Sequence, residues 1–288
     1  SSVPLHLQLF GALGFPPVRY AHIAPLMKQA GGSRRKLSKR HDPEASVGFY
    51  IEQGYPAAAV EYYLRGLANG RLAEMPLPEA LGTPVRLAEM GTAGPLVDLV
   101  KLDDICADHV ATLPGRRILD EVAAWARRHD PELAAVLEGE RELALRALAI
   151  EREDTAKPRK DLRKWADFRV VYGYFFPEIF RPVADPADPR FGGLDPDLVR
   201  ALAAGFADGY APDAADWFGQ VRRLAAGLGF APDQKAYKRD PGGYPGSIRE
   251  ASQVIRVLLT GTTRSPNLPE VAAALGPDEV LRRVRALH

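Results

Sequence analysis

The chain has 288 residues, of which 46% are hydrophobic and 26% are charged, as in ordinary folded proteins, and this length allows two or three domains. Because 38 basic residues balance 37 acidic ones, the net charge of +1 excludes a general attraction for nucleic acid, so phosphate binding must come from local clusters. The single cysteine, Cys106, excludes an intramolecular disulfide and a cysteine-based metal site, and no apolar run approaches the ~20 residues that cross a bilayer. These features predict a soluble, cytoplasmic protein in which Cys106 is a buried, small apolar helix residue.

The N-terminal forty residues predict a short α/β segment. Apolar residues at helical spacing predict a helix over 4–13, which Gly14 can end. A short apolar and aromatic run predicts a strand over 18–27, although Pro25 weakens its end. The pair Gly31-Gly32 then predicts a flexible turn before a basic segment.

The rest of the chain is predicted to be almost wholly helical. Strands with strict alternation are scarce, so the fold class is mainly α, a short α/β remnant followed by a long helical body. Residues 44–70 predict two short helices that break at 54–56, and a connection rich in glycine and proline follows up to residue 95. Further helices are predicted over 118–128, 131–153, 165–180, 195–207, 214–228 and 247–259, with a loop over 181–194 and a short helix after Pro277.

The basic segment 33–41, SRRKLSKRH, contains five cations and no acidic residue before Asp42. A mobile loop of this composition can close over a polyphosphate, because ammonium groups stabilise the charge that develops on phosphoryl oxygens. Lysine suits this role as a compact point charge. The alternative is a solvated surface turn, which is what most charge runs are. The cations are Arg34, Arg35, Lys36, Lys39 and Arg40.

The letters KLSKR at 36–40 resemble the lysine-serine-lysine signature loop of class I aminoacyl-tRNA synthetases, in the form typical of glutamyl-tRNA synthetases. The surrounding residues resemble the same family. They include LHLQLFGALGF before the loop, AHIAPL leading into it, FYIEQGYP behind it, and LTG with SPNL and LG near the C-terminus. The resemblance covers essentially the whole chain.

This resemblance implies a role for each residue of the loop in binding ATP. Lys39 would contact ATP, and Lys36 would assist with the phosphates or hold the loop. Ser38 would supply the hydroxyl between the two lysines. The expected strand would line the adenine side through backbone groups, which makes His22 and Ile23 further ATP-binding candidates. For His22, a packing role is the alternative.

The implied reaction is the activation of glutamate by ATP, with Mg²⁺ bound through ATP, followed by transfer of the glutamyl group to tRNA. The family's histidine-glycine motif and its glutamate-binding groups lie upstream of the loop and have no counterpart here. We therefore expect a C-terminal portion of the enzyme, inactive alone, whether a truncated chain, a partial gene or one product of a split gene. The rival function is a non-catalytic RNA-binding protein with the same helical body. One cysteine and six scattered histidines predict no zinc site.

The resemblance also divides the chain and names its partners. Residues 1–43 would end the catalytic nucleotide-binding domain, 44–113 would contact the tRNA stem, and 114–288 would form an α-helical anticodon-binding domain. The implied partners are L-glutamate and tRNA(Glu), with tRNA(Gln) as a second candidate, and no membrane. The implied state is a monomer.

Two clusters that mix cations with an aromatic residue are candidates for RNA contact, KPRKDLRKW at 157–165 and QKAYKR at 234–239. Cations bind phosphates, and aromatic faces can stack on unpaired bases. For Trp165 the spacing instead favours a core position, together with Phe168, Tyr172 and Phe176. The cations could equally coat a helix surface. The candidate RNA-binding residues are Lys157, Arg159, Lys160, Arg163 and Arg249.

Overall fold

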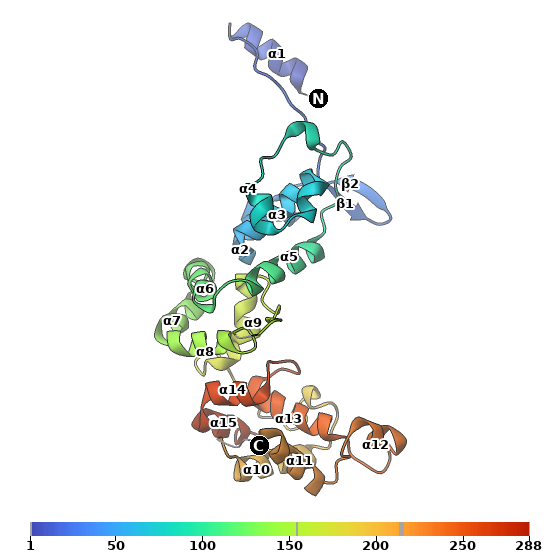
Figure 1. The fold of residues 1–288 in the computed structure, drawn as a ribbon, viewed down its shortest axis with the longest axis vertical. Helices are drawn as coiled ribbons and strands as arrows, with labels where there is room; N and C mark the ends of the chain where they lie inside the picture. Colours follow the sequence, from blue (N-terminus) through green and yellow to red (C-terminus); the bar gives the residue numbers. More distant parts are fainter. Residues whose placement is uncertain (1, 154, 213–215, 288) are drawn as a thin grey trace. The chain divides into compact units, whose positions relative to one another are not determined.

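The structure is a computed structural model that describes residues 2–153, 155–212 and 216–287, and Figure 1 shows its elements in chain order. Helices predominate, and the described residues form one sheet of only two strands, which confirms the prediction of a mainly α fold. Within those residues, no helix is long and apolar enough to cross a bilayer.

The chain forms two compact units, each with its own internal contacts. The first consists of Ser1–Ile51 and Pro56–Ile105, and the second of Glu52–Tyr55 and Cys106–His288. The expected three-part division at residues 43 and 113 stays a prediction.

The N-terminal unit combines short helices with a hairpin. The predicted helix at its start and the two short helices before residue 70 are confirmed. Two of its helices, α2 and α5, also contain residues of the other unit. The elements are α1 (Val3–Ala12), β1 (Met27–Ala30), β2 (Ser33–Lys36), α2 (Val47–Gln53), α3 (Ala57–Ala68), α4 (Leu77–Gly82) and α5 (Leu99–Ala111).

The hairpin of β1 and β2 differs from the predicted strand and flexible turn. β1 pairs antiparallel with β2, from Met27 opposite Lys36 to the two residues beside the turn. Gly31 and Gly32 have φ values of +52° and +84°, which a two-residue hairpin turn requires and which glycine adopts without strain. The prediction of a strand over 18–27 is therefore wrong: residues 18–26 are neither helix nor strand, because the strands flank the glycine pair and Pro25 lacks the N–H for a ladder.

Helix α1 has an unusual surface, because none of its residues is buried. Its apolar side chains remain in contact with solvent, so this helix gains little from packing within the unit. The exposed apolar residues of this region are Leu5, Leu7, Leu9, Leu13 and Phe15.

Helices and the loops that connect them make up the described part of the C-terminal unit. The predicted helix over 131–153 is two helices separated at Glu140, and the aromatic stretch 165–180 contains one short α-helix flanked by 3₁₀ turns. The helix predicted over 214–228 begins at Trp217, after the N-cap residue Asp216, and 213–215 lie outside the described residues. The elements are α6 (Gly115–His129), α7 (Pro131–Gly139), α8 (Arg141–Ala149), α9 (Phe168–Tyr172), α10 (Pro196–Gly209), α11 (Trp217–Gly227), α12 (Gln234–Arg239), α13 (Ile248–Thr260), α14 (Leu268–Leu275) and α15 (Pro277–Val284).

The described residues of this unit form two apolar cores. The first is formed mainly by α6 to α9, and the second mainly by α10, α11 and α13 to α15. Trp165 lies in the first core with 6% of its surface exposed, together with Phe168, Tyr172 and Phe176, so the predicted core role of these aromatic residues is confirmed. Cys106 is also fully buried, as predicted.

Candidate functional site

The basic segment continues from strand β2 into a closed turn. The Leu37 N–H donates to the Leu26 carbonyl at 2.9 Å, which ties the end of the strand to the preceding chain. The N–H groups of His41 and Asp42 then donate to the Ser38 carbonyl at 3.0 and 2.8 Å. Lys39 stands within this turn, and its side chain is exposed.

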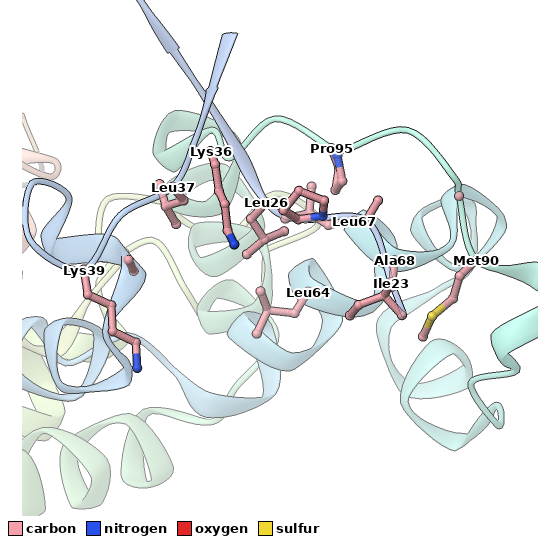
Figure 2. A pocket seen from close by; sticks show the side chains of 14 residues that line it. Ile23, Leu26, Lys36, Leu37, Lys39, Leu64, Leu67, Ala68, Met90 and Pro95 are labelled. Atoms are coloured by element: carbon pink, nitrogen blue, oxygen red, sulfur yellow. The ribbon is translucent and has the colours of Figure 1, made fainter. Parts of the chain in front are cut away.

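A pocket of about 510 Å³ opens beside the turn, and it is mainly apolar. Lys36 and Lys39 lie toward one side of it in Figure 2, and Ala68 and Met90 toward the other. Helix α3 contributes Leu64 to its lining, and the segment before β1 contributes Ile23, Pro25 and Leu26. Apolar walls and two ammonium groups suit a ligand with an apolar ring and a polyphosphate.

The candidate residues of the signature loop are only partly brought together at this pocket. Lys36, Lys39 and Ile23 line it. Ser38 does not: its N–H donates to Asp42, and its hydroxyl lies 3.4 Å from the Arg40 nitrogen. His22 is exposed, which excludes the core-packing alternative, and it is not among the residues that line the pocket.

Two buried carboxylates, Asp42 and Glu44, lie behind the loop. Arg35 donates to both oxygens of Asp42 at 2.6 Å, and Lys28 pairs with Asp42 at 3.3 Å and also with Glu44. The Arg35 guanidinium, more than the Ser38 N–H and Lys28, holds the pKa of Asp42 well below its usual range, although burial acts in the opposite direction. Hydrogen bonding to Glu44 likewise raises the pKa of Lys28.

These ion pairs separate the cations of the segment into two kinds. Arg35 is neutralised by Asp42, so it is not available to a ligand. Within the described part of the chain, neither Lys36 nor Lys39 has an ion-pair partner. The two lysines that line the pocket are therefore not neutralised by a carboxylate of the described residues and are available to an anionic ligand.

In the C-terminal unit, Arg159 is held in internal ion pairs. Its guanidinium lies 2.8 Å from Glu151 and 2.7 Å from Asp161. Burial by itself would lower the pKa of Arg159, but these two carboxylates outweigh it and raise the pKa. A half-buried arginine that is already paired is poorly placed to bind a phosphate.

The other RNA-binding candidates differ in how much free charge they carry. Lys160 pairs with Asp108 at 2.7 Å, and Arg163 with Asp167 at 3.1 Å. Lys157 and Arg249 are exposed, and the described residues provide no ion-pair partner for either of them. These two cations are the best placed of the five for contact with RNA.

The sequence of the chain resembles curated ligases along its whole length. It is 34% identical over 290 residues to "Glutamate--tRNA ligase" of Clostridium perfringens (strain 13 / Type A), and the match covers 99% of this chain and 53% of the relative. The protein of the same name from Sorangium cellulosum is 35% identical over 305 residues, with 99% and 53% covered. The chain belongs to the glutamate–tRNA ligase family. It spans about half the length of the curated relatives that it matches, and corresponds to their C-terminal portion.

A family model matches part of the chain, and a solved structure resembles its fold. The Anticodon binding domain model matches residues 247–288 of the ligase-family chain. The crystal structure of a glutamate tRNA ligase from Elizabethkingia meningosepticum aligns with a TM-score of 0.60, at 18% identity, over 99% of this chain and 54% of the other. At this identity the alignment supports the fold alone.

Two features in and around the pocket of this ligase-family member could not be predicted from its sequence. Asp42 was visible only as the first acidic residue after the basic run, and nothing in the sequence paired it with Arg35. Leu64 on α3 has 42% of its surface exposed and lines the pocket, which no motif in the sequence indicates.

Proposed function

We propose that this chain acts as the C-terminal portion of a glutamate–tRNA ligase, in which it supplies the ATP loop and the surface that binds tRNA. The complete enzyme would join glutamate to AMP with release of pyrophosphate, and would then transfer the glutamyl group to tRNA(Glu). The observation that carries this proposal is the pair Lys36 and Lys39, which occupy the signature positions and line one pocket. The second candidate substrate is tRNA(Gln).

In this proposal the chain's own contribution to activation is electrostatic. The ammonium groups of Lys36 and Lys39 would bind the phosphates of ATP and stabilise the charge that grows on the leaving pyrophosphate. Mg²⁺ bound to ATP would stabilise part of the same negative charge. Among the described residues, no group of three or more His, Cys, Asp or Glu side chains is placed to hold a metal ion, so the metal would be held through the phosphates. The prediction that this portion has no zinc site remains untested.

The chain alone is expected to bind tRNA but not to activate glutamate. The groups that bind glutamate in the family lie upstream of the signature loop, and no matching motif is found here. The monomeric state and the cytoplasmic location expected from the sequence stay predictions.

Binding of tRNA to the 288-residue chain tests the RNA-binding part of the proposal. If Lys157 and Arg249 each neutralise one phosphate, affinity should fall about tenfold between 50 and 200 mM salt, since about two counterions are released. Replacement of both residues by alanine should reduce that slope by about 1.4–1.8 in log–log units. The control is Arg141→Ala, which also removes one exposed cation, but one that is already paired with Asp120.

A salt-independent affinity would contradict an RNA-binding surface on this chain. A slope that stays the same in the Lys157 and Arg249 double variant would place that surface elsewhere. Normal tRNA binding by a chain whose complete parent enzyme shows no ATP–pyrophosphate exchange would favour the rival function, a non-catalytic RNA-binding protein.

A further inference from the structure

We propose that Asp42 is a positioning residue for the ATP loop. Its buried carboxylate holds the turn 38–42 closed, and the closed turn presents Lys39 at the edge of the pocket. The proposal rests on the proposed function, because it takes Lys39 as the group that meets ATP. Asp42 itself does not line the pocket and acts only through the loop.

The Asp42 carboxylate collects donors from three parts of the chain. Only 1% of the residue is exposed. Arg35 on β2 donates to each of its oxygens at 2.6 Å, Lys28 on β1 lies 3.3 Å away, and the Ser38 N–H of the loop donates at 2.9 Å. The loop is therefore fastened to both strands of the hairpin through one side chain.

The contacts between Ser38 and Asp42 are reciprocal, and they fix the backbone on both sides of Lys39. The Ser38 N–H donates to the Asp42 carboxylate, and the Asp42 N–H donates back to the Ser38 carbonyl at 2.8 Å. The Arg35 guanidinium that binds Asp42 also donates to the Lys36 carbonyl at 3.3 Å. One carboxylate thus sets the backbone beside both lysines of the pocket.

Only an ionised carboxylate satisfies this set of donors. Its two oxygens offer about four acceptor positions, and bonds from charged donors are roughly twice as strong as neutral ones. Asparagine would keep one acceptor oxygen and turn an NH₂ group toward the N–H groups of Arg35 or Ser38. We therefore expect Asp42→Asn to open the turn while it changes the volume of the side chain very little.

A double-mutant cycle tests whether Asp42 acts through Lys39. ATP–pyrophosphate exchange is measured with tRNA present, in the full-length ligase that carries this chain as its C-terminal portion. Asp42→Asn should lower kcat by about 10- to 100-fold, since a small misplacement of a group at a reacting centre costs up to about 10² in rate, and should leave the KM for glutamate unchanged. In a Lys39→Ala background the same substitution should change the rate by less than about twofold, because residues that act as a unit are not additive.

Two further variants separate positioning from general damage. Asp188→Asn is the matched control, because Asp188 also pairs with an arginine, Arg190 at 2.8 and 2.6 Å, and also accepts a backbone N–H, but it lies in the other unit. Its exchange rate should stay within about twofold of wild type. Arg35→Lys keeps the positive charge and loses the bidentate contact, so it should show a smaller loss with the same dependence on Lys39.

The outcomes distinguish this proposal from the proposed function. Normal exchange in Asp42→Asn, with a strong loss in Lys39→Ala, would overturn the positioning role alone. If Asp42→Asn lowers the exchange rate equally with and without Lys39, Asp42 supports folding and does not position Lys39. If Asp42→Asn fails to fold, the Arg35→Lys variant tests the positioning role instead. In that variant the hydrogen exchange of the Ser38 amide should be faster than in wild type. Normal exchange in Lys39→Ala would overturn the assignment of the loop itself.

Discussion

Replacement of Phe168 by alanine tests whether the aromatic stretch of the C-terminal unit is a core. Phe168 is fully buried, and its ring centre lies 5.1 Å from that of Tyr172 and 6.4 Å from that of Phe176. Removing a buried phenylalanine side chain costs about 3–5 kcal/mol, because apolar contacts are lost and a cavity remains. The loss of two ring contacts places the expected decrease in the free energy of unfolding in the upper part of that range.

The control for this variant is Val170→Ala on the same helix, α9. Val170 is 77% exposed, so its truncation should change the free energy of unfolding by no more than about 0.5 kcal/mol. Urea denaturation of both variants, followed by circular dichroism and tryptophan fluorescence, measures the difference. A decrease below about 1 kcal/mol for Phe168→Ala would refute the position of this stretch in the core.

Three other predictions concern stability. Ser247→Ala should lower the free energy of unfolding by about 0.5–2 kcal/mol, because Ser247 and Glu250 form a capping box at the start of α13; a thermal midpoint equal to that of wild type would contradict this. Deletion of residues 1–17 should leave the urea midpoint unchanged, since α1 buries no residue, and a clear decrease would show that α1 packs on the unit. Burial raises the pKa of Tyr172 to about 12, against about 10 in an unfolded chain, so its stabilising contribution is complete below pH 10 and is lost as the pH rises toward 12. In Tyr172→Phe, denaturation midpoints between pH 10 and 12 should therefore fall less steeply than in wild type, and an equal slope would contradict the raised pKa.

The helical body could be predicted from the sequence because helical periodicity is a local signal. The apolar spacing identified α3, α6 and α13 within a few residues, and the aromatic spacing placed Phe168 and Tyr172 in a core. The hairpin could not be predicted with the same success. Its register depends on the two positive φ values at Gly31 and Gly32. The apolar run over 18–27, which was predicted as the strand, has no strand partner in the described residues apart from the contacts near Met27.

The sequence predicts which charged residues belong to the candidate site, but not which of them lack an ion-pair partner. The signature letters located Lys36 and Lys39, and the structure places both at one pocket. A count of cations could not show that Arg35 and Arg159 are held by carboxylates, because pairing depends on how the backbone between the partners bends, even for Asp161, only two residues from Arg159. Ion pairing is a tertiary property, so the free charge of a basic run is known only after the fold.

ATP–pyrophosphate exchange by the Lys39→Ala variant of the full-length ligase, with tRNA present, tests the central claim most directly. If Lys39 binds the phosphates of ATP as activation proceeds, the exchange rate should fall by about 10² or more, which corresponds to about 2.7 kcal/mol in barrier height. The matched control is Arg34→Ala, which removes one exposed cation from the same segment. Because Arg34 does not line the pocket, the exchange rate of this variant should stay within about twofold of wild type. Near-normal exchange in Lys39→Ala, or an equal loss in Arg34→Ala, would contradict the claim that this lysine meets ATP.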